Sequence, residues 1–126
     1  MTAEVASAIE ELRLAFPSCS VTFEPEAQGG AYVTVSGIDI GEGYTPSTTW
    51  LGFLIGFQYP RSDVYPHYID VEVKRTDKAN HGGGFANATW CQKAVIQISR
   101  RSNRLDPTVD TASTKLAKVI EWVRTR

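Results

Sequence analysis

Between residues 20 and 74 the sequence reads as a succession of strands that no helical pattern interrupts. Apolar and polar residues alternate at 21–23, 32–35 and 68–73, and residues 50–59 form a largely apolar run broken by two glycines. Alternation with a period of two is typical of strands with one buried face. Strands joined by short turns pair antiparallel, because a parallel pair needs a long crossover connection. The sequence therefore predicts a four-stranded antiparallel meander.

An amphipathic helix is predicted before these strands, over residues 2–16. Its apolar residues recur at spacings of three and four, which places them on one face of a helix: Val5, Ile9, Leu12 and Phe16. Thr2 is of a type that caps helix N-termini, and Pro17 ends the helix because proline cannot donate a backbone hydrogen bond.

A second amphipathic helix is predicted after the strands, from Asp106 to Arg126. Asp106 is expected to cap it, and Pro107 suits the first turn, where its missing N–H costs nothing. One apolar stripe runs along it: Val109, Ala112, Leu116, Val119, Ile120 and Val123. The basic residues Arg124 and Arg126 face the negative end of the helix dipole.

Periodicity leaves the segment between residues 74 and 105 open. As a strand, Ala94, Ile96 and Ile98 share one face, and Cys91 lies on the polar face with Lys93 and Gln97. As a helix, Cys91, Val95 and Ile98 share an apolar face instead. Only the strand exposes the thiol. The order of elements predicts a single α+β domain over residues 1–126: helix, meander, irregular segment, helix.

Composition restricts the partners of this domain. Hydrophobic residues make up 42% and charged residues 21%, which is ordinary for a globular protein. The net charge is −1 with both signs interspersed, so no basic field for nucleic acid or an anionic membrane is expected. Arg100, Arg101 and Arg104 are a local exception that could hold a phosphate or an acidic partner, or could be a solvated surface.

The sequence also bears on the compartment. No apolar run is long enough for a membrane span, and the N-terminus has no basic region of the secretory type. Two cysteines are too few for a disulfide framework. These features predict a cytoplasmic protein.

Residues 81–91 carry the clearest chemical signal. His81 lies ten positions before Cys91, and the glycines 82–84 fill part of the gap. A thiol attacks carbonyl carbons without a metal or cofactor, whereas free cysteine is also common as a buried small hydrophobe. His81 is either a general base or, as we favour, a donor that braces the loop. The glycine N–H groups either face an oxyanion or form a flexible turn.

Several short motifs accompany this arrangement. Tyr59-Pro60 followed by Tyr65-Pro66 closes the third predicted strand. Asn87 leads through Ala88-Thr89-Trp90 into Cys91, and Asp106-Pro107 opens the last predicted helix. In these motifs, and in the order of its elements, the chain resembles the ubiquitin-conjugating enzyme (UBC) family. It is most similar to the divergent bacterial members encoded beside ubiquitin-like proteins.

The resemblance implies a UBC-like fold and a transferase. Cys91 would accept a ubiquitin-like protein as a thioester and transfer it to an amine of a target protein. His81 would arrange the loop, Asn80 or Asn87 would polarise the thioester carbonyl, and nearby Lys93, Arg100 or Arg101 would favour the thiolate. The reaction needs an activating enzyme but no metal or organic cofactor. The resemblance also implies a bacterial source and a role in antiviral defence.

Other functions remain open from the sequence. The family's His-Pro-Asn triplet reads His81-Gly82-Gly83 here, and the missing asparagine favours an inactive UBC-like or RWD-like domain that binds a ubiquitin-like protein or scaffolds a complex. A zinc site from Cys19, His67, His81 and Cys91 lacks the close ligand pairs typical of such sites. No metal and no cofactor is therefore predicted. The triplet of glycines after His81 resembles an esterase oxyanion loop, but no Gly-x-Ser-x-Gly motif accompanies it.

Overall fold

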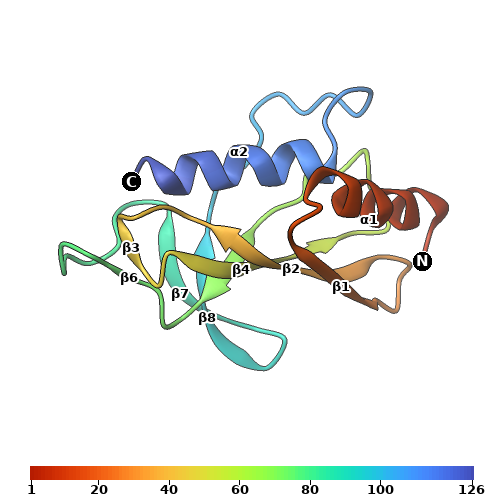
Figure 1. Ribbon diagram of the computed structural model, residues 1–126. Coiled ribbons are helices and arrows are strands. Elements are labelled where there is room, and N and C mark those ends of the chain that lie inside the picture. The colour runs from red at the N-terminus through yellow and green to blue at the C-terminus, as the bar shows by residue number, and fades with distance from the viewer.

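A six-stranded antiparallel sheet with two helices on one face forms the computed structural model, which describes residues 1–126 (Figure 1). This confirms the predicted α+β class. A separate two-stranded sheet joins two short loop segments. In chain order the elements are α1 (Ala3–Ala15), β1 (Ser20–Pro25), β2 (Ala31–Asp39), β3 (Tyr44–Thr45), β4 (Thr48–Ile55), β5 (His67–Asp70), β6 (Lys74–Arg75), β7 (Phe85–Trp90), β8 (Lys93–Ile98) and α2 (Ala112–Arg124).

The predicted meander is present as β1, β2, β4 and β5, which lie side by side in this order and pair antiparallel. Each pair aligns apolar residues on the same face of the sheet. Val33 of β2 lies opposite Phe53 of β4, and Leu51 of β4 lies opposite Ile69 of β5. These side chains are fully buried.

The sheet continues past the meander, where an irregular segment was predicted. Residues 85–98 form a hairpin in which β8 pairs with β5 and β7 becomes the sheet edge. The irregular assignment was therefore wrong for these residues, and the strand alternative is confirmed. Periodicity failed because Val95 and Ile96 are neighbours on opposite faces of the strand and both are buried.

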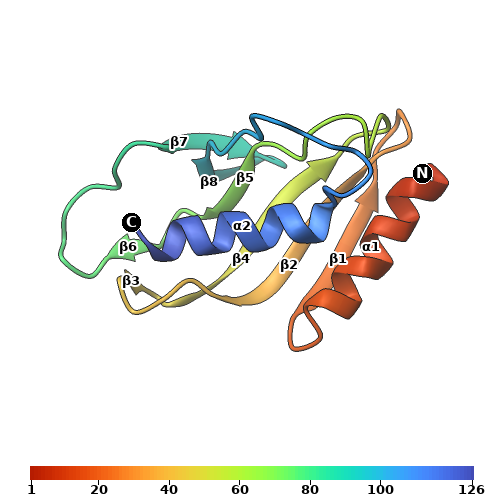
Figure 2. The ribbon, with the colours of Figure 1, turned by 90° about the horizontal axis from the view of Figure 1, so that it is seen from above.

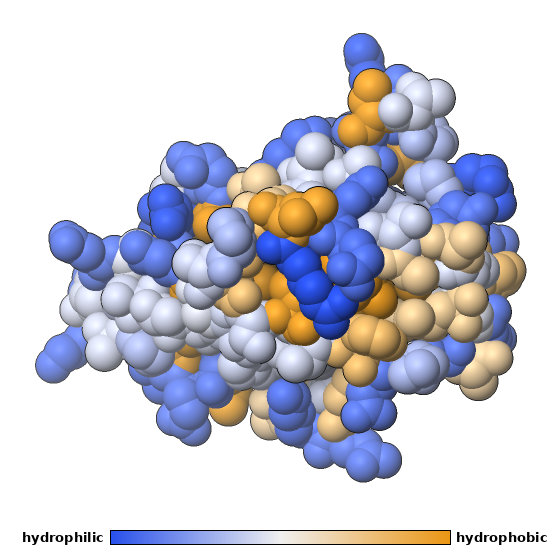
Figure 3. Space-filling view, turned by 45° about the vertical axis from the view of Figure 1, so that its right-hand side comes forward, coloured by the Kyte–Doolittle hydropathy of each residue, from blue (hydrophilic) through white to orange (hydrophobic).

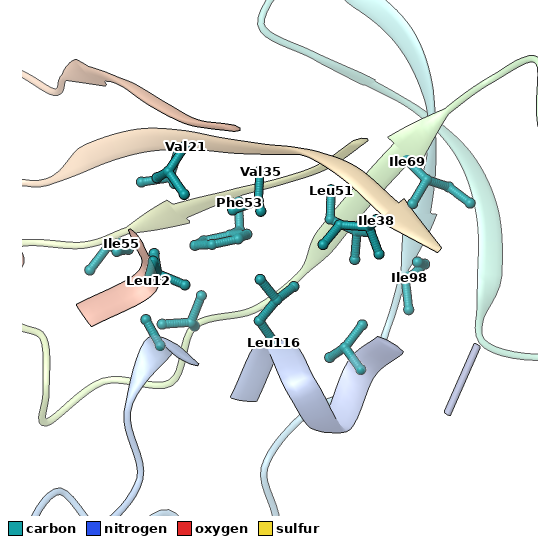
Figure 4. Packing of buried hydrophobic residues seen from close by; sticks show 14 of the residues in the cluster. Leu12, Val21, Val35, Ile38, Leu51, Phe53, Ile55, Ile69, Ile98 and Leu116 are labelled. Carbon is teal, nitrogen blue, oxygen red and sulfur yellow. The ribbon is translucent and has the colours of Figure 1, made fainter. Parts of the chain in front are cut away.

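The hydrophobic core fills the space between the helices and the inner face of the sheet (Figure 4). Leu12 of α1 and Leu116 of α2 point into it, toward Phe53 and Leu51 of the sheet. Figure 2 shows that α2 crosses the strands, whereas α1 lies along β1. Neither helix is long and apolar enough to cross a membrane.

The first helix forms where the sequence predicts it, within one residue at each end. The side chain of Thr2 accepts a hydrogen bond from the backbone N–H of Val5 at 3.1 Å and so caps the helix. Val5, Ile9 and Leu12 are buried as expected.

The second helix begins later than predicted, and the capping role assigned to Asp106 was wrong. Thr111 is the N-cap, and its hydroxyl accepts from the N–H of Thr114 at 3.1 Å. The Asp106 carboxylate instead accepts hydrogen bonds from the N–H and hydroxyl of Thr108, which forms a local turn. Short polar side chains compete with helix formation in this way. Val109 consequently lies outside the helix and is exposed.

Two tyrosine hydroxyl groups hold the ends of α2 against the sheet connections. The N–H of Ala112, at the start of the helix, donates to the Tyr59 hydroxyl at 3.0 Å. The Tyr44 hydroxyl donates to the carbonyl of Val123, near the end of the helix, at 2.8 Å. The Ala112 N–H would otherwise lack an intrahelical partner, whereas the Val123 carbonyl also accepts from the N–H of Arg126 at 3.2 Å. Burial raises the pKa of both phenols.

Candidate functional site

Cys91 lies at the tip of the β7–β8 hairpin. Trp90 and Lys93 form the last strand pair, so Cys91 and Gln92 make a two-residue turn. Both turn residues have positive φ angles, 49° and 65°, as a type I′ turn requires. Cys91 is exposed, which excludes its burial as a core hydrophobe.

Trp90 holds this hairpin tip against the outer face of the sheet, on the side away from the helices. Its ring stacks on Tyr68 of β5 with centroids 4.9 Å apart, and it also meets Trp50 of β4 at 6.3 Å and Tyr32 of β2 at 6.4 Å. Gly52 leaves room for the indole, because a Cβ atom there would come within 2.3 Å of it. The contacts of Trp90 therefore hold the hairpin tip over β2, β4 and β5.

A groove of 330 Å³ beside Cys91 results from this placement. Trp90 and Lys93 line it from the hairpin, and β1 and β2 supply the other residues: Thr22, Phe23, Glu24, Tyr32 and Thr34. No local pattern in the sequence links these strands to Cys91. Only the tertiary position of the hairpin brings them together.

The surroundings of Cys91 disfavour the thiolate. Desolvation raises the pKa of the Cys91 thiol, and the charge of Glu24 adds to this. Lys93 lowers the pKa, as expected, but does not reverse the shift. Its ammonium group lies over the Trp50 ring at 4.2 Å. Arg100 and Arg101 do not serve this thiol, because their guanidinium groups lie over Trp122 and Tyr65.

His81, Asn80 and Asn87 line a different groove, of 450 Å³, to which β6, β7 and the segments around β6 contribute. The His81 ring stacks between Tyr44 and Phe85, at centroid distances of 6.1 and 5.1 Å. Its Nε2 lies 3.0 Å from the carbonyl oxygen of Val73 and, as the donor, fixes the tautomer. The other nitrogen, Nδ1, is buried without a partner. These are the contacts of a residue that braces its loop.

The four residues expected at one site therefore occupy two. The five residue steps of β7 from Phe85 to Trp90 span roughly 17 Å at about 3.3 Å per residue. This extended strand separates Cys91 from His81 and Asn80, whereas Asn87 lies within it, three steps or about 10 Å from Trp90, and lines the other groove. The spacing of ten residues was compatible with a compact loop, but the chain uses most of it as a strand.

Of the three glycines after His81, only Gly84 is required by the packing of the structure. Gly84 has a φ of 89°, and a Cβ atom there would lie 2.6 Å from the Trp122 ring. Nothing lies within 4 Å of the corresponding positions at Gly82 and Gly83.

No group of three or more histidine, cysteine, aspartate or glutamate side chains is placed to hold a metal ion. The four residues considered for a zinc site lie apart from one another. His67 is buried in the core, the Cys19 thiol donates to the carbonyl of Gly37, and His81 and Cys91 lie in their separate grooves.

In comparisons with known proteins, no family model matches the chain, and no curated protein and no solved structure is significantly similar to it.

Proposed function

We propose that this chain is a UBC-like domain that binds a ubiquitin-like protein without carrying it covalently. The single observation that carries this proposal is the separation of Cys91 from His81, Asn80 and Asn87 along β7. Aminolysis of a thioester develops negative charge on the carbonyl oxygen, and catalysis requires donors within hydrogen-bond distance of that oxygen. Asn80 lies beyond the other end of β7, and Asn87 lies within this strand and lines the other groove.

The order of elements supports the UBC-like part of the proposal. An N-terminal helix, a meander and a late helix follow one another, with both helices on the same face. Tyr59-Pro60 and Tyr65-Pro66, on which the resemblance rests, lie in the connection from β4 to β5.

The outer face of the sheet supplies a surface for a protein partner. Tyr32 and Leu54 lie opposite each other on β2 and β4, and each is 37% exposed. Trp50, Tyr68 and Trp90 are half-buried beside them. Exposed clusters of aromatic and aliphatic residues on a sheet are typical of protein interfaces. A ubiquitin-like protein is the partner that the sequence resemblance suggests.

The test is a titration of the ¹⁵N-labelled chain with ubiquitin and bacterial ubiquitin-like proteins, followed by NMR. We expect shifts at Tyr32, Leu54 and Tyr68 with at least one of them, and their loss in Leu54→Asp. Leu14→Asp is the matched control, because Leu14 is an exposed leucine on α1. Absence of binding to every probe, or equal loss in both variants, would overturn the proposal.

A second candidate function is the thioester transfer itself. It is favoured by the exposure of the Cys91 thiol beside a groove open to solvent. Incubation with an activating enzyme, a ubiquitin-like protein and ATP would then give an adduct that disappears with reductant and in Cys91→Ser. Such an adduct would replace the non-covalent proposal with the catalytic one. Binding without an adduct supports the first proposal.

A further inference from the structure

A groove of 450 Å³ lies between the loop after β8 and α2. Figure 1 shows the loop and α2 on the helix side of the sheet, so the groove that they line is apart from the outer face discussed above. The residues that line it are largely basic: Arg100, Arg101 and Arg104 from the loop, and Lys115 and Lys118 from α2. Asp110 is the only carboxylate in the lining.

The two lysines already have acidic partners. Lys115 is buried and donates to both oxygens of Asp63, at 3.0 and 3.1 Å. Lys118 lies 3.6 Å from an oxygen of Asp110. The three arginines form no salt bridge with any carboxylate, so the groove carries an uncompensated positive charge at Arg100, Arg101 and Arg104.

Contacts with aromatic rings position two of these guanidinium groups. Arg100 lies over the Trp122 ring at 5.0 Å, and Arg101 lies over the Tyr65 ring at 4.5 Å. A guanidinium that stacks on a ring keeps its N–H donors at the edge, where they can form paired hydrogen bonds with a carboxylate.

The loop backbone is also fixed. The N–H of Ser102 donates to Asp63 at 2.7 Å, and its hydroxyl donates to the other oxygen of Asp63 at 2.9 Å. Lys115 donates to the same hydroxyl at 2.7 Å. This half-buried network holds Ser102 between the arginines and α2. The arginines therefore start from an ordered loop, which lowers the entropic cost of binding.

We infer that this groove binds an acidic peptide segment of a partner protein, in an extended conformation with several aspartate or glutamate residues. Carboxylates complement the three arginines through charge-assisted, paired hydrogen bonds. The lining extends along α2 from Lys115 to Trp122, which is about 10 Å at 1.5 Å per residue. This length suits about three extended residues and exceeds a single bound ion.

Two other anionic ligands fit less well. Proteins that bind nucleic acid use a basic surface that contacts many phosphates. Here the net charge is −1, and the cluster of three unpaired arginines is confined to one loop. Figure 3 shows hydrophilic and hydrophobic residues intermixed over the face that it presents. A free phosphate would engage only part of the groove.

The experiment measures fluorescence anisotropy of a labelled short peptide rich in glutamate, against the same peptide with glutamine at each of these positions. We expect binding of the first alone, weakened by salt and by about tenfold or more in Arg104→Glu. Lys74→Glu makes the same charge change outside the groove and serves as the control. Arg104→Gln, which removes the charge without reversing it, should give a smaller loss, and a thermal melt of each variant checks its fold.

Several results would overturn this inference. They are equal binding of the two peptides, equal weakening by Arg104→Glu and Lys74→Glu, and tighter binding of a single-stranded oligonucleotide of matched charge. Full displacement of the peptide by an equal concentration of inorganic phosphate would also do so, because it would assign the site to the ion.

Discussion

His67 makes the stability of this domain depend on pH in a way that can be measured at one residue. The side chain is completely buried beside Phe53, with ring centroids 5.1 Å apart. Neither ring nitrogen has a hydrogen-bond partner. Burial, assisted by the charge of Lys115, lowers the pKa of His67 to about 3, against an ordinary value of 6.5. The folded protein therefore keeps this histidine neutral.

The direction and size of the effect follow from the two pKa values. Above pH 6.5 the ring is neutral in both states, and pH has no effect through this group. As the pH falls from 6.5 toward 3, the unfolded chain takes up a proton that the folded protein excludes, so the free energy of unfolding decreases. The loss is about 1.4 kcal/mol per pH unit, or about 2 to 3 kcal/mol at pH 4.5. That is a large part of the 5–15 kcal/mol typical of a domain.

This pH window separates the titration of His67 from that of Asp63, a half-buried carboxylate whose charge acts on His67. Hydrogen bonds from Ser102 and Lys115 outweigh desolvation and lower the pKa of Asp63 below its usual 3.8. A carboxylate with a lowered pKa contributes stability that is lost only as the pH falls from its unfolded value through its folded value. Measurements between pH 4.5 and 7 therefore lie above the range in which Asp63 titrates.

The assay is urea unfolding followed by tryptophan fluorescence at several pH values in this window. His67→Leu removes the titrating group and the two unpaired nitrogens, so we expect it to lose less stability than the natural chain as the pH falls. His81→Gln is the matched histidine control, and a smaller loss in His67→Leu than in His81→Gln assigns the effect to His67. If His67→Leu and the natural chain show the same pH dependence, the buried neutral histidine is not its cause.

Three further predictions follow from individual contacts. Gly52→Ala should displace Trp90 from the sheet, because the added Cβ would lie 2.3 Å from the indole. The fluorescence of Trp90 should shift to longer wavelength, and the free energy of unfolding should decrease by about 1–3 kcal/mol. Gly82→Ala, with open space around it, should change neither the fluorescence nor the stability. Tyr44→Phe should lower the free energy of unfolding by about 1 kcal/mol through loss of the hydrogen bond to Val123, and an unchanged urea midpoint would contradict the role of this bond. In a Cys19→Ser background, iodoacetamide should alkylate Cys91 faster after Glu24→Gln and more slowly after Lys93→Ala. The reason is that Glu24 raises and Lys93 lowers the pKa of the Cys91 thiol. Alkylation rates that are the same in both variants as in the background would refute this account.

The elements that the sequence predicts well are those whose pattern is complete within a short segment. Alternation identified β2 and β5 because one face of each is buried and the other is not, and it identified β1 although only Val21 is buried there. Thr2 and Pro17 delimited α1 for local reasons, a side-chain cap and a missing donor. These features depend on neighbours in the chain.

The elements that the sequence predicts poorly depend on contacts between distant segments. Val95 and Ile96 are both buried, so β8 shows no clean alternation. Asp106 and Thr111 are both residue types that can cap a helix, so the local sequence does not show where α2 begins. The first helical N–H, of Ala112, donates to the hydroxyl of Tyr59, which is distant in the sequence. The position of Cys91 depends on Trp90 meeting rings on three other strands.

The two proposed surfaces lie on opposite sides of one sheet, and this arrangement has a consequence for how the domain works. The outer face presents Tyr32 and Leu54, whereas the basic groove uses Arg100 and Arg104 on the side that α2 covers. Because the core separates them, occupation of one surface does not obstruct the other. According to the two proposals, a ubiquitin-like protein and a second partner with an acidic segment would therefore bind at the same time, as a scaffold requires. Leu54→Asp should then abolish only the binding of the ubiquitin-like protein, and Arg104→Glu should weaken only the binding of the acidic segment, since neither residue contributes to the other surface.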